Sequence, residues 1–232
     1  MQKHTILIFI FFLTTFLCFG QKEHLEPTKD FNQHGGVLKE YYDNLFPLLY
    51  SGFSDMPYAR YTSMPSFSAE YAFSVEKINE KNYIISNKFS ENFWYAGYDN
   101  NGNMVNEKRN TVKIATVKTE ISDDLYLIIG ELFELFVEQT KVKERKFDTL
   151  PDGTIVEIHE IGTDGETYIF TTTDKNGEIR TGTTWSPHPS DKPLLSRLVE
   201  ICDNLYLLGI ENDISQTNIL REIDILINDF KN

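Results

Sequence analysis

The sequence predicts an α+β fold in which helices pack on an antiparallel sheet. Segments with a two-residue hydrophobic period fall into two blocks, residues 66–118 and 154–185, joined internally by short turn-forming connections. Parallel neighbours would need crossovers of roughly a dozen residues or more, so these connections favour a meander and hairpins. Segments with a 3.6-residue period surround the two blocks, and two such segments lie at the C-terminus.

The chain begins with the pattern of an export signal. Lys3 precedes a largely apolar run, residues 6–19, that is shorter than the roughly 20 residues needed to span a bilayer. We therefore predict a signal peptide at residues 1–20, a flexible leader at residues 21–36 and a single α+β domain at residues 37–232. The expected location is periplasmic or extracellular, in the manner of a secreted bacterial protein, with no integral membrane span after signal removal.

The cysteines argue against a lipid anchor and against a disulfide. Lipidation at Cys18 is disfavoured because Leu17, and not a small residue, precedes it. After removal of the signal peptide, Cys202 is the only remaining cysteine and no intramolecular disulfide can form. The stability of the fold must therefore come from the hydrophobic core. Cys202 lies on the apolar face of a predicted helix, where we expect a buried small side chain.

Acidic residues outnumber basic residues, which limits the possible partners. The chain has 22 Lys and Arg against 35 Asp and Glu, and losing Lys3 with the signal peptide changes the formal charge from −13 to −14. Nucleic acid is excluded as a partner because phosphate backbones are bound by concentrated basic side chains. A basic protein partner is favoured electrostatically, although an acidic surface also keeps a secreted protein soluble.

The first half of the domain is predicted to contain one helix followed by a meander. Residues 37–50 have a helical apolar face that Pro47 must kink or end, and residues 51–65 are predicted to be a tyrosine-rich loop. Residues 99–110 are polar and contain Gly102, which indicates a long hairpin tip. Strands are predicted at residues 71–76, 83–86, 93–98 and 111–118.

The second half is predicted to contain a helix, a further set of strands and two closing helices. Ser122 is a good helix N-cap, since its hydroxyl can accept an early amide hydrogen. Asp164-Gly165 and Asn176-Gly177 suit tight hairpin turns between the next strands. These strands are residues 154–159, 166–173 and 179–185, and the closing helices are residues 190–209 and 213–230.

No catalytic or metal-binding motif stands out. The histidines outside the signal peptide, His24, His34, His159 and His188, lack the spacing of a zinc helix, and no cysteine pair completes a structural site. We therefore predict no metal site, no cofactor and no assigned catalytic residue.

Aromatic residues supply the candidate binding surface. Trp94, Tyr95 and Tyr98 lie close together, and consecutive aromatic residues cannot all face one core. Trp185 and His188 lie between a predicted strand end and a helix start, a position where loops often carry function. The two prolines there are explained equally well as a stop for the strand and an entry to the helix, so a purely structural role stays open.

These observations favour an exported, non-enzymatic binding protein, for example an inhibitor or immunity-type protein, whose aromatic and acidic surface contacts a protein partner. One alternative is a hydrolase of peptidoglycan or polysaccharide, in which paired carboxylates act as acid and base. Another alternative is a structural component of the cell envelope. An enzyme should show convergent ionisable groups in a hollow, whereas a binding protein should show an exposed aromatic patch.

Overall fold

The computed structural model describes residues 23–28, 35–99, 101–143, 146–150, 152–158, 164–211 and 213–232. The predicted signal peptide, His34 and His159 lie outside these ranges. Within them, no helix combines the length and the apolar character needed to cross a bilayer.

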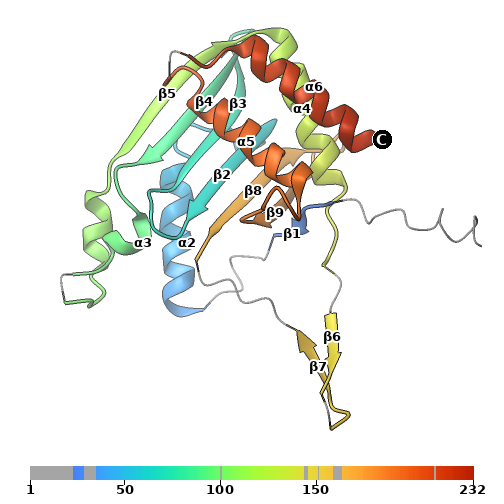
Figure 1. Cartoon of the computed structure of the whole chain (residues 1–232). Helices are drawn as coiled ribbons and strands as arrows, with labels where there is room; N and C mark the ends of the chain where they lie inside the picture. The colour runs from blue at the N-terminus through green and yellow to red at the C-terminus, as the bar shows by residue number, and fades with distance from the viewer. Residues whose placement is uncertain are drawn as a thin grey trace, which may run out of the picture.

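Seven strands form the main sheet, in the order β1-β9-β8-β2-β3-β4-β5 (Figure 1). All neighbouring strands are antiparallel, which confirms the predicted antiparallel sheet. β2 to β5 form a meander, and the β8–β9 hairpin returns to pair with β2. The strands are β1 (Glu26–Pro27), β2 (Ala59–Pro65), β3 (Tyr71–Ile78), β4 (Lys81–Phe89), β5 (Ile114–Ile121), β8 (Glu166–Thr173) and β9 (Ile179–Trp185).

Helices cover both faces of this sheet. Side chains alternate along β3, so that Phe73 belongs to the core beneath α4, α5 and α6, and Ala72 to the core beneath α2 and α3. In Figure 1, α5 and α6 cross the first face together with α4. The helices are α2 (Gly36–Leu49), α3 (Phe93–Ala96), α4 (Asp123–Glu138), α5 (Pro193–Leu207) and α6 (Gln216–Lys231).

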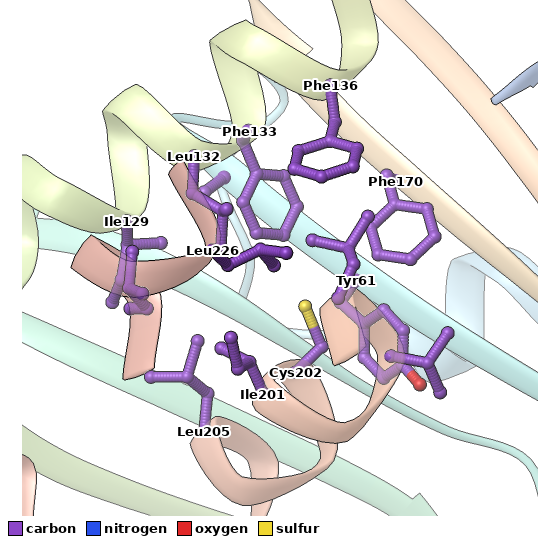
Figure 2. Close-up of a cluster of buried hydrophobic side chains, with 14 of the residues drawn as sticks. Tyr61, Ile129, Leu132, Phe133, Phe136, Phe170, Ile201, Cys202, Leu205 and Leu226 are labelled. Atoms are coloured by element: carbon purple, nitrogen blue, oxygen red, sulfur yellow. The ribbon is translucent and has the colours of Figure 1, made fainter. Parts of the chain in front are cut away.

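The larger core lies between the sheet and α4, α5 and α6. Figure 2 shows Phe133 and Phe170 in this layer, with ring centroids 5.9 Å apart and ring planes inclined by 56°. Cys202 points into the same core and is fully buried, as its position on the helix predicts. Burial raises the pKa of its thiol well above the usual value. The thiol is therefore neutral and packs as a small apolar side chain.

The positions of the longer helices agree with those predicted from the sequence. α2 contains Pro47 and buries Tyr41, Leu45 and Leu49 on one face. The predicted cap of α4 is confirmed, because the Ser122 hydroxyl accepts a hydrogen bond from a backbone amide in the first turn. α5 and α6 are the two predicted C-terminal helices.

The prediction that residues 51–65 form a loop is wrong in its second half. β2 is a central strand between β8 and β3. Both its faces are covered: Tyr61 belongs to the larger core, while Arg60 and Thr62 are buried on the opposite face. There the Tyr50 hydroxyl hydrogen-bonds Thr62 at 2.9 Å, and the Arg60 guanidinium lies 4.5 Å from the Tyr50 ring. Buried polar residues conceal the strand pattern.

The prediction of a strand at residues 93–98 is also wrong. The first four of these residues form α3, because the Asn92 side chain accepts a hydrogen bond from the Tyr95 amide and caps the helix. The predicted strand at 111–118 begins later, at Ile114, after a 3₁₀ helix, Asn106–Thr111.

The Asp164-Gly165 hairpin does not form, whereas the second predicted hairpin is confirmed. β7 (Ile155–Ile158) pairs with β6 (Lys146–Thr149) and not with β8. This small hairpin stands apart from the main sheet in Figure 1. β8 and β9 pair through the turn at Gly177, whose φ of 81° suits glycine.

Candidate functional site

A groove opens on the α2 side of the sheet, beside the end of β2 and the start of β8. Its volume is about 370 Å³. Met64 and Thr167 contribute from the strands, and we call the hollow the aromatic groove because five rings line it. These rings belong to Tyr41, Tyr42, Phe67, Trp94 and Tyr95.

The short helix α3 positions two of these rings. Besides capping α3, Asn92 donates hydrogen bonds from its side-chain amide to the carbonyls of Pro65 and Ser68, at 3.3 and 2.8 Å. Phe93 is fully buried and fixes the inner side of the helix. The adjacent Trp94 and Tyr95 are thereby held at the groove by a residue that ties α3 to the β2–β3 connection.

Glu70 joins the two helices that form the walls. Its carboxylate accepts hydrogen bonds from the Tyr41 hydroxyl and the Phe93 amide, each at 2.8 Å, and only 1% of the residue is exposed. Burial raises the pKa of Glu70, and its hydrogen bonds oppose that rise. Burial also raises the pKa of Tyr41, so its hydroxyl stays protonated as a donor. Glu70 therefore links α2 to α3, the two helices on either side of the groove.

Three large rings on this side of the sheet stay exposed. Phe67 and Tyr95 are 67% and 49% exposed and lie nearly parallel, with centroids 6.2 Å apart. Trp185, 47% exposed, pairs across the strands with Thr167, a groove residue. Gly165 permits this placement, because a Cβ at that position would lie under 3.0 Å from the Trp185 ring.

The structure thus places the five predicted binding residues in different settings. Trp94 and Tyr95 line the aromatic groove, and Tyr98 packs on Trp94 with centroids 5.9 Å apart. Trp185 belongs to the neighbouring strand on the same face. His188 is exposed in the segment before α5 and does not line the groove.

The surroundings of His188 resemble a catalytic triad only in composition. His188 Nδ1 lies 2.9 Å from the Ser190 hydroxyl, which donates a hydrogen bond to the Asp191 carboxylate at 2.7 Å. The serine hydroxyl therefore lies between the imidazole and the carboxylate. A nucleophilic serine needs the reverse order, with histidine between serine and carboxylate. Ser186, in the same segment, accepts a hydrogen bond from the Glu166 amide at 2.8 Å.

A second cluster, on the α5 side of the sheet, brings carboxylates and tyrosines together. The hydroxyls of Tyr61 and Tyr71 donate to one oxygen of Asp203, at 2.7 and 2.8 Å. Burial raises the pKa of Asp203 to about 6, the tyrosine hydrogen bonds lower it, and the charge of Glu166 raises it further. We call Tyr61, Tyr71, Tyr168, Glu166 and Asp203 the tyrosine–carboxylate cluster.

Glu166 forms the other half of this cluster. It accepts hydrogen bonds from the Ser63 hydroxyl and, at 2.9 Å, from the Tyr168 hydroxyl. Sequence reasoning missed both carboxylates, since partners such as Tyr61 and Asp203 are 142 residues apart. It also missed Phe67, a lone aromatic between two serines that shows no period.

Metal ligands do not gather in the described ranges, where no three His, Cys, Asp or Glu side chains form a metal-binding group. Comparisons with protein-family models, with curated proteins and with solved structures gave no match. The function must therefore be argued from the two clusters themselves.

Proposed function

We propose that the chain is an exported, non-enzymatic binding protein that contacts a protein partner through the aromatic groove and its rim. The observation that carries this proposal is the exposure of Phe67, Tyr95 and Trp185 on one face. Aromatic rings are enriched at protein interfaces because a rigid, amphipathic ring supplies much contact area at low entropic cost. Export is supported by the predicted signal peptide.

The polar groups of the groove favour binding over catalysis. Glu70 and Asn92 both hydrogen-bond to the protein's own backbone. An acid or base must reach a substrate proton within hydrogen-bond distance, and these groups already hold α3 in place. Asp164 is exposed and lines the groove, so it adds an acidic group to the aromatic surface.

A pull-down from envelope and extracellular fractions tests this proposal. The bait is the protein lacking residues 1–20, with Tyr95→Ala and Trp185→Ala as groove-side variants. We expect a protein partner that the native bait retains, with retention reduced about tenfold or more by either variant, since interface aromatics often contribute 2 kcal/mol or more. Both side chains are about half exposed, so the folded state should tolerate their loss.

Leu127→Ala is the matched control. Leu127 is 63% exposed on α4, over the opposite face of the sheet, and should leave retention unchanged. Equal retention by all folded baits would contradict the proposal. Capture of nothing by the native bait would favour the structural role in the envelope.

The tyrosine–carboxylate cluster favours hydrolysis of an envelope polymer as a second candidate. Asp203, with a pKa of about 6, could donate a proton near neutral pH, while Glu166 could act as the base. Release of soluble fragments from peptidoglycan or polysaccharide would support this candidate if Asp203→Asn and Glu166→Gln each abolished it. Activity that survives both changes would count against the cluster.

A further inference from the structure

The aromatic groove is lined by charge of one sign. Glu70 and Asp164 contribute carboxylates, and its described lining residues include no Lys, Arg or His. The chain as a whole is strongly acidic, with a formal charge of −13. Clefts of one sign with low-dielectric walls concentrate the electrostatic field, and this field attracts ligands of opposite charge.

A buried cation, Arg109, lies against two rings of the groove wall. The Arg109 guanidinium is 5.7 Å from the Tyr41 ring and 5.9 Å from the Trp94 ring. It lines a neighbouring hollow together with Glu40 and Glu107, and it is 3% exposed. Glu70 is buried and hydrogen-bonded to Tyr41 and Phe93, which leaves the rings and Asp164 as the accessible contributors. Arg109 also shows that these two rings accept a cation at cation–π distance.

We propose that the aromatic groove accepts a Lys or Arg side chain presented by the protein partner. This inference rests on the proposed function. The walls are lined by aromatic rings, whose faces attract a cation, and Asp164 offers an exposed carboxylate at the groove. A volume of about 370 Å³ lies near the lower end of the roughly 300–1,000 Å³ of ligand pockets, which suits one long side chain.

Tryptophan fluorescence can report on the groove directly. The chain has two tryptophans, Trp94 and Trp185, so a Trp185→Phe variant leaves Trp94 as the single reporter. This variant is titrated with capped short peptides that carry arginine, lysine, citrulline or glutamate at one central position. Citrulline keeps the shape and most donors of arginine but has no charge, and it isolates the contribution of the cation.

We expect saturable changes with the arginine and lysine peptides, and binding roughly 3- to 30-fold weaker with citrulline. Asp164→Asn should weaken arginine binding about two- to fivefold, in the range of an exposed ion pair. Asp224→Asn, on the exposed side of α6, is the matched control and should change nothing.

Equal binding of arginine and citrulline peptides would overturn the inference. So would the lack of a saturable change with either basic peptide up to about 10 mM, because weaker binding carries little free energy. If the pull-down partner still depends on Tyr95, such results leave the proposed function standing. If basic peptides bind the groove but no protein is captured, the cation site stands and the proposed function fails.

Discussion

At the scale of single residues, Asp203 shows how a buried charge can be positioned by side chains far away in sequence. Its two tyrosine partners, Tyr61 and Tyr71, come from adjacent strands of the sheet. Burial raises the pKa of each tyrosine hydroxyl, so both remain donors. The carboxylate is therefore hydrogen-bonded but poorly hydrated, and its charged form is disfavoured in the folded state.

This arrangement predicts that Asp203 makes folding dependent on pH. The pKa is about 6 in the folded protein against a usual value of 3.8, so the folded state holds the extra proton between these values. The contribution to the free energy of unfolding is present below about pH 4 and is lost as pH rises through 6. A shift of about two units corresponds to at most about 3 kcal/mol, and about 1–3 kcal/mol is expected.

Urea unfolding of the native protein and of Asp203→Asn at pH 4 and pH 7 measures this effect. Asparagine keeps an acceptor for the tyrosines but carries no charge. The native protein should lose about 1–3 kcal/mol more than the variant between the two pH values. Asp224→Asn should follow the native protein. Parallel pH dependence of native protein and Asp203→Asn would show that the carboxylate does not titrate in this window.

At the scale of elements, the sequence predicts those helices and strands that bury a single apolar face. α4, α5 and α6 each bury one side against the sheet; α4 begins directly after its predicted cap, and the ends of α5 and α6 agree with the prediction to within three residues. β2 was hidden because both its faces are buried and one of them is polar. α3 was hidden because four residues are too few to display a helical period.

The candidate site was predictable in part for the same reasons. Aromatic density alone pointed to Trp94 and Tyr95, although their expected strand is a helix. Glu70 and Phe67 gave no signal, since their roles depend on α2 and α3 meeting across the β2–β3 connection. Contacts between segments far apart in sequence carry no local pattern that could reveal them.

The contact between α4 and the segment before β2 gives a second prediction. Tyr58 stacks on Tyr126 of α4, with centroids 4.1 Å apart and planes inclined by 5°. Gly130, one turn later on α4, leaves room for this ring, because a Cβ there would lie under 3.0 Å from it. Gly130→Ala should destabilise the protein by about 1–3 kcal/mol, although alanine favours a helix by about 1 kcal/mol.

A double-mutant cycle, measured by thermal and urea unfolding, isolates this contact. In a Tyr58→Ala background the steric conflict is gone, and Gly130→Ala should instead stabilise by up to about 1 kcal/mol. If Gly130→Ala changed stability in the same direction with and without the Tyr58 ring, that ring would not be the reason why position 130 requires glycine.

At the scale of the whole molecule, the N-terminal segment closes the fold. Residues 23–28 lie in the predicted leader, yet β1 pairs with β9 to form one edge of the sheet and Leu25 is fully buried. The Glu23 carboxylate accepts hydrogen bonds from the amides of Leu194 and Leu195, at 3.1 and 3.0 Å. It thereby caps α5, whose own N-cap residue makes no side-chain hydrogen bond.

Because Glu23 caps α5 from a distant part of the sequence, we expect it to contribute to the stability of that helix. A carboxylate at a helix N-terminus satisfies free amides and meets the positive end of the helix dipole, so Glu23→Ala should lower the free energy of unfolding by about 0.5–2 kcal/mol. Glu23→Gln keeps one acceptor and should lose less. Deleting residues 1–28 should cost more, because burial of Leu25 adds about 1.5–3 kcal/mol.

Urea unfolding of these variants, with exposed Glu91→Ala as the control, provides the stability measurement. Amide hydrogen exchange then locates the change, and faster exchange is expected in the first turns of α5 when Glu23 is replaced. If Glu23→Ala matches Glu91→Ala in both measurements, the N-terminal segment rests on α5 without stabilising it. If only the deletion of residues 1–28 lowers the free energy of unfolding, the stabilisation by the N-terminal segment comes from Leu25 and β1 and not from Glu23.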